Sequence, residues 1–114
     1  MKTLSCFLVL FAAIAAGQSK ELTGNVDNGK RLFVRNGCYQ CHGYVGQGGA
    51  AGARLAQTKL PLAGFTAFVR NPPPSGMPPF RAKVMSDQEL ADVWAYIKSI
   101  PEPKPVKDIP LLNQ

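Results

Sequence analysis

The sequence predicts a small all-α domain, and three observations favour it. Apolar residues recur at three- and four-residue spacing in segments 25–36 and 86–100, as on one face of a helix. No segment shows the alternation of apolar and polar residues that is typical of a half-buried strand. Stretches rich in glycine and proline separate the helical patterns, which favours short helices joined by irregular loops.

The first 17 of the 114 residues have the features of an export signal. Lys2 gives a positive start, residues 4–14 are apolar, and Ala15, Ala16 and Gly17 offer the small side chains that a signal peptidase requires. The apolar run is too short to span a bilayer as a stable helix. We therefore expect a cleaved signal peptide at 1–17, a folded domain at 18–100 and a proline-rich tail at 101–114, with no integral membrane segment after cleavage.

Residues 25–36 predict the first helix of the domain. Val26, Leu32 and Phe33 share one face, and Gly37 ends the pattern. Gly29 has two interpretations. It either weakens this helix by about 1 kcal/mol relative to alanine, or its missing side chain lets another helix cross closely.

The next segment, residues 38–42, is a C-x-x-C-H motif that contains the only histidine of the chain. A disulfide between Cys38 and Cys41 would close a very small loop and stabilise little. The spacing is instead typical of covalently attached c-type haem. The two thiols add to the haem vinyl groups as thioethers, and His42 binds the iron. The apolar porphyrin would also complete the marginal core of a domain this small.

Two other uses of the motif rank below haem attachment. A structural zinc site takes four nitrogen or sulfur ligands, and beyond residues 38–42 the exported chain offers no further cysteine or histidine. A thioredoxin-like dithiol belongs in a mixed α/β context, whereas the flanks here are helical or rich in glycine.

The segment after the motif alternates between loop and helix. Residues 43–52 contain five glycines and predict a loop. Residues 63–70 predict a helix of two turns, which the prolines at 72–74 end. Residues 72–80 include five prolines around Met77 and predict a stiff, extended strap.

A haem iron also needs an axial ligand opposite His42. Once the leader is removed, the thioether candidates are Met77 and Met85. Met85 precedes the last predicted helix, where it matches a hydrophobic staple with Leu90, whereas Met77 has no packing role in an extended strap. We therefore predict Met77 as the ligand. His/Met ligation raises the reduction potential of a haem and fills both axial positions.

The last predicted helix follows Ser86, which forms a capping box with Glu89. Leu90, Val93 and Ile97 recur along one face, and Pro101 follows its end. The tail 101–114 is compatible with packing on the domain, with contact to a partner and with no contact at all.

Charge limits the kinds of partner. Without Lys2 the chain carries 12 basic and 7 acidic side chains, a net charge of +5. The basic residues are scattered rather than clustered, so we expect no nucleic-acid partner. They form either a solvated basic surface or a field that steers the protein toward an acidic partner.

Together these segments resemble the class I c-type cytochrome family over residues 25–100. The resemblance rests on Gly29 and Phe33, the C-x-x-C-H motif, Met77-Pro78-Pro79-Phe80 and Trp94-Ala95-Tyr96-Ile97. It implies a cytochrome c fold, with three to four short helices around one covalently bound haem. The N- and C-terminal helices would cross near a right angle at Gly29, with Phe33 and Tyr96 packed there.

The resemblance also implies groups around the cofactor. Many members have glycine-proline-leucine after the motif, and the proline carbonyl accepts a hydrogen bond from the axial histidine. This chain has Gly52-Ala53-Arg54-Leu55 instead, so Ala53 is expected to supply that carbonyl. Arg54 and Arg81 are candidates for binding the haem propionates.

These inferences predict periplasmic electron transfer by one haem c, attached through Cys38 and Cys41 and ligated by His42 and Met77. The protein would be a soluble carrier or the small cytochrome subunit of an exported dehydrogenase, and not itself an enzyme. Its partners would be redox proteins with an acidic docking surface. The alternative is a haem-based sensor or enzyme for a small ligand, in which Met77 leaves the iron.

Overall fold

The computed structural model describes residues 21–74 and 76–113, so the predicted signal peptide at 1–17 lies outside the described residues. Four α-helices follow one another: α1 (Val26–Arg35), α2 (Cys38–His42), α3 (Leu62–Arg70) and α4 (Asp87–Ser99). Two 3-10 turns, η1 (Val106–Asp108) and η2 (Pro110–Leu112), lie in the tail. Over the described ranges the chain forms no β-strand, which confirms the all-α class.

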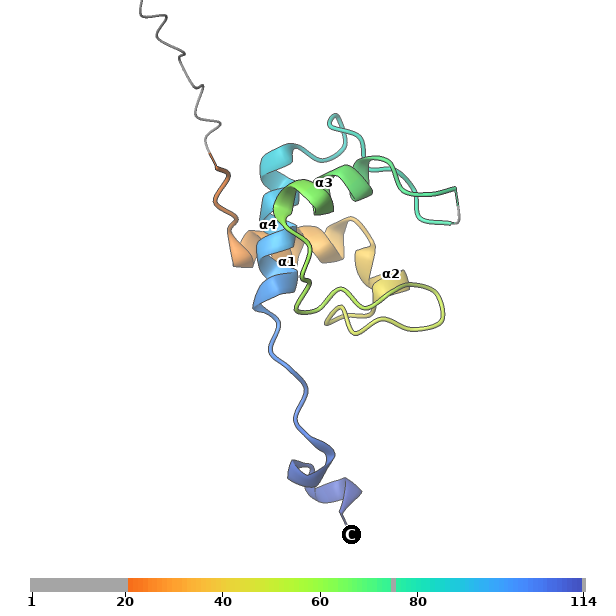
Figure 1. The fold of residues 1–114 in the computed structure, drawn as a ribbon, viewed down its shortest axis with the longest axis vertical. Helices are drawn as coiled ribbons and strands as arrows, with labels where there is room; N and C mark the ends of the chain where they lie inside the picture. The colour runs from red at the N-terminus through yellow and green to blue at the C-terminus, as the bar shows by residue number, and fades with distance from the viewer. Residues whose placement is uncertain (1–20, 75, 114) are drawn as a thin grey trace, which may run out of the picture.

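The crossing of α1 and α4 organises the domain (Figure 1). A Cβ atom at Gly29 would lie 1.9 Å from the carbonyl oxygen of Asp92, so only glycine fits at this crossing. The rings of Phe33 and Tyr96 meet edge to face, with their centroids 5.5 Å apart. The structure therefore supports close helix crossing as the role of Gly29.

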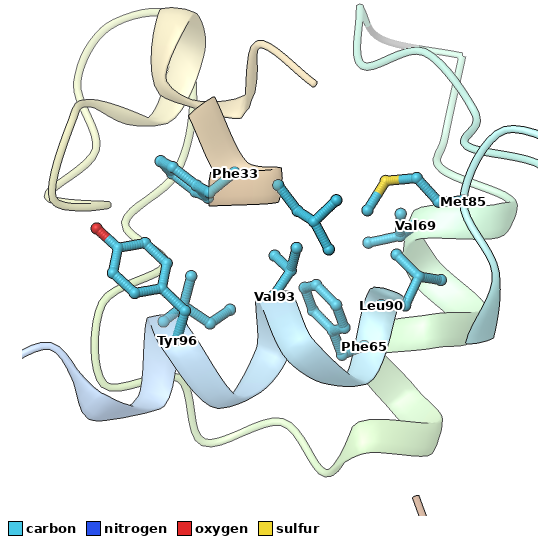
Figure 2. Close-up of a cluster of buried hydrophobic side chains, with 9 residues drawn as sticks. Phe33, Phe65, Val69, Met85, Leu90, Val93 and Tyr96 are labelled. Carbon is cyan, nitrogen blue, oxygen red and sulfur yellow. The ribbon is translucent and has the colours of Figure 1, made fainter. Parts of the chain in front are cut away.

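The core lies between α1, α3 and α4 (Figure 2). Met85 and Leu90 are both buried in it, as the predicted staple requires, and the capping box of Ser86 and Glu89 is present at the start of α4. The capping box is thus confirmed, and both residues of the predicted staple lie in one buried cluster. The buried residues of the cluster are Leu32, Phe33, Phe65, Val69, Met85, Leu90, Val93, Tyr96 and Ile97.

Asp92 is a buried charged residue at the same crossing. Its carboxylate accepts hydrogen bonds from the backbone N–H of Asn25 at 2.8 Å, from Nδ2 of Asn28 at 2.6 Å and from Nε2 of Gln88 at 3.0 Å. Burial by itself raises the pKa of Asp92, but the three hydrogen bonds together hold it below its usual range. The carboxylate thus fixes the start of α1 to α4.

The tail leaves α4 and extends away from the four helices (Figure 1). Nε2 of Gln57 donates to the carbonyls of Ile100 at 2.6 Å and Pro101 at 2.8 Å, which anchors the first residues of the tail. Beyond them the side chains are exposed except for Ile109, which is half-buried. Within the described part of the chain, no helix has the length and apolar character needed to cross a membrane.

Candidate functional site

The C-x-x-C-H motif forms its own short helix, α2. Gly37 precedes it with a φ of 72°, and the N–H of Gly43 donates to the carbonyl of Tyr39 at its end. Residues three apart on a helix lie on the same side, so the free thiols of Cys38 and Cys41 share one side of α2. Burial raises the pKa of the Cys38 thiol above its ordinary value.

The orientation of His42 is set by the glycine-rich loop. Its Nδ1 lies 2.7 Å from the carbonyl oxygen of Ala53, the contact expected from the resemblance. A carbonyl can only accept, so the proton must reside on Nδ1, which leaves the lone pair of Nε2 available for a metal. A Cβ atom at Gly52 would lie 2.8 Å from the carbonyl oxygen of Cys41, so glycine is needed for this close approach.

A cavity of about 750 Å³ brings the four predicted site residues together. Cys38, Cys41, His42 and Met77 all line it, although Met77 comes from a different part of the chain. This volume lies within the usual range of about 300–1,000 Å³ for cofactor sites. The apolar residues lining it include Phe33, Leu55, Leu60, Phe65, Phe68, Val69, Phe80, Leu90 and Val93.

The two methionines that line the cavity differ in their surroundings. Met85 is 1% exposed and packs within the core. Met77 is partly buried and packs against the core from the strap. Met85 is thus the more deeply buried of the two, and Met77, for which the sequence indicated no packing role, contacts the same buried cluster.

The candidate propionate ligands are separated by the fold. Arg54 lines the cavity, together with Lys59. Arg81 is exposed and lies outside the residues that line it. No Asp or Glu is found among the described residues that line the cavity.

Two residues that the sequence patterns missed support the walls of the site. Gln57 has a φ of 56° and its N–H donates to the carbonyl of Ile97, so it joins the loop to the end of α4. Arg70 donates to the carbonyl of Phe80, the last residue of the strap, and to that of Met85, which follows it. Neither role has a signal in the sequence, because the partners lie 10 to 44 residues away.

Comparison with known proteins assigns the family. The family model for subunit III of cbb3-type cytochrome c oxidase matches residues 24–97. Cytochrome c-555 of Methylococcus capsulatus (strain Bath) is 32% identical over 96 residues, which cover 80% of this chain and 75% of that protein. This chain belongs to the small monohaem c-type cytochromes. No solved structure matches it.

The cofactor of this cytochrome is covalently bound haem c, and its function is electron transfer by that haem. The residues present fit the group. Two cysteines and an imidazole with a free Nε2 line the cavity, and apolar side chains supply much of the rest of its lining. Family membership removes the zinc and dithiol alternatives.

Proposed function

We propose that this cytochrome holds its haem through thioether bonds to Cys38 and Cys41, with His42 and Met77 as the axial iron ligands. The observation that carries the proposal is the convergence of these four residues on one cavity. The contact between His42 and the Ala53 carbonyl supports it, because second-shell partners of this kind fix the tautomer of metal-binding histidines.

The haem supplies one-electron chemistry when bound, through the ferrous and ferric states of its iron. The Ala53 carbonyl holds the proton on Nδ1 of His42 and raises the basicity of Nε2. The thioether of Met77 favours the reduced state and so raises the reduction potential. Apolar side chains such as Phe65 and Val69 exclude water from the site, and solvent access is a second determinant of that potential.

The protein would act in the periplasm after removal of residues 1–17, as a soluble carrier formed by domain 18–100 and tail 101–114 or as a subunit of an exported dehydrogenase. The features of the leader support export. Arg54 and Lys59 bring positive charge to the cavity lining, which has no acidic residue among its described members, although Glu102 from the tail pairs with Arg54 at 3.3 Å. This charge favours a partner with an acidic docking surface, where complementary charge increases the rate of association.

A pair of matched variants tests the ligation. Met77→Ala should remove the methionine–iron absorption band, lower the reduction potential and let carbon monoxide or cyanide bind. Met85→Ala, the control, should keep the band and lose about 2–5 kcal/mol of stability, because it creates a cavity in the core. The opposite result would assign the iron to Met85. Rapid binding of carbon monoxide to the unmodified protein at neutral pH would instead favour the sensor or enzyme.

A further inference from the structure

The guanidinium of Arg70, at the end of α3, binds the C-terminal end of the strap and the residues that follow it. Its Nη1 donates to the carbonyl oxygens of Phe80 and Met85, both at 2.6 Å, and its Nη2 pairs with Asp87 at 2.6 Å. The side chain of Arg70 is only 15% exposed. Since the donor is charged, these hydrogen bonds are stronger than those between neutral groups.

The strap has few other attachments. The N–H of Phe80 donates to the carbonyl of Val69 at 3.0 Å, and the N–H of Asn71 donates to that of Ala67. Between these two points, positions 72–74 and 76–79 make no backbone hydrogen bond to another described residue. Met77 lies three residues before Phe80, so apart from its own packing against the core its position depends on how firmly Phe80 is held.

We propose that Arg70 is a positioning residue that keeps Met77 on the iron, an inference that rests on the ligation proposed above. The Arg70 clamp, by which we mean its bonds to Phe80, Met85 and Asp87, closes the strap against α3 and α4. Loss of the clamp raises the fraction of molecules in which Met77 has left the iron. A purely structural role would hold α3 on α4 without affecting that fraction.

Titration of the ferric holoprotein with imidazole measures this fraction. Exogenous imidazole competes with Met77, so its apparent affinity is proportional to the population of the released strap. Arg70→Gln removes the charge and should tighten imidazole binding by about tenfold or more, equivalent to about 1.4 kcal/mol. Arg70→Lys keeps the charge but lacks the planar fork that serves several acceptors, and it should give an intermediate change.

Two variants serve as controls. Arg35 pairs with Glu89 at 3.1 Å, so Arg35→Gln removes another ion pair to the first turn of α4 without touching the strap. It should change imidazole affinity by less than about twofold. Asp87→Asn removes one partner of the clamp and leaves both carbonyl contacts, and it should give a smaller effect than Arg70→Gln.

The outcomes separate this inference from the proposed ligation. If Arg70→Gln and Arg70→Lys lower stability but bind imidazole like Arg35→Gln, the clamp is structural only and the inference is wrong. If Arg70→Gln does not fold, the Arg70→Lys titration decides between the same two results. If Met77→Ala keeps the methionine–iron band, the ligation itself fails, whatever the Arg70 variants show.

Discussion

The crossing at Gly29 gives a substitution whose effect can be worked out from distances. In Gly29→Ala the new Cβ would lie 1.9 Å from the Asp92 carbonyl oxygen and 2.5 Å from its carbonyl carbon. Because both neighbouring atoms are backbone, α1 and α4 must separate by about 1.5 Å to restore an ordinary van der Waals distance of about 3.4 Å. Overpacking of this kind costs about 1–3 kcal/mol, and the higher helix propensity of alanine offsets about 1 kcal/mol.

The net loss of folding stability is therefore about 0–2 kcal/mol. We expect a loss near 2 kcal/mol, because the atoms that the new Cβ meets are backbone atoms and cannot move aside as a flexible side chain would. For a domain of this size that corresponds to a fall in melting temperature of about 8–16 °C. The assay is thermal and denaturant unfolding of the holoprotein, followed by far-ultraviolet circular dichroism.

Gly64→Ala provides a matched control within another helix. The nearest atoms to its added Cβ are side-chain atoms of Pro61 at 3.7 Å, an ordinary van der Waals distance. The same substitution should here stabilise the protein by up to about 1 kcal/mol through helix propensity. Equal stability of the two variants, or greater stability of Gly29→Ala, would refute close helix packing as the role of Gly29.

Two further substitutions test the hydrogen bonds that connect distant segments. Asp92→Asn should cost about 1–3 kcal/mol at neutral pH. The pKa of Asp92 is lower in the folded state than its ordinary value of about 3.9. The carboxylate therefore contributes its full stabilisation above that ordinary value and loses it as the pH falls through the lower folded value. Denaturant unfolding should thus show that Asp92→Asn loses less stability than the unmodified protein when the pH is lowered. Gln57→Ala should cost about 1–2 kcal/mol for the lost Ile100 and Pro101 contacts; Gln57→Gly should be less destabilised because glycine accepts a φ of 56°. An unchanged acid profile for Asp92→Asn, or the reverse order of the Gln57 variants, would contradict these assignments.

Features that depend on neighbouring residues were predicted correctly from the sequence. The spacing of apolar residues indicated α1 and α4, the prolines after residue 71 indicated the end of α3, and the capping box of Ser86 and Glu89 was found as a local pattern. The motif at 38–42 indicated haem c, which family membership confirms as the cofactor, because covalent attachment of that group uses two cysteines and a histidine at this spacing. Each of these signals lies within a few residues of its partner, so one sequence is enough to detect it.

Groups joined across long loops could not be predicted in the same way. Asp92 accepts from the N–H of Asn25, 67 residues earlier, and Nε2 of Gln57 reaches Pro101, 44 residues later. In the sequence, Arg70 resembles any charged residue at the exposed end of a helix. Only the folded path of the strap brings the carbonyls of Phe80 and Met85 to its guanidinium. The sequence alone therefore determined α1, α3 and α4 and identified haem c as the cofactor, but it did not indicate that residues 38–42 form the separate helix α2. The tertiary structure alone decided which side chains hold the cavity walls, because a hydrogen bond depends on the final distance between its atoms and not on their separation along the chain.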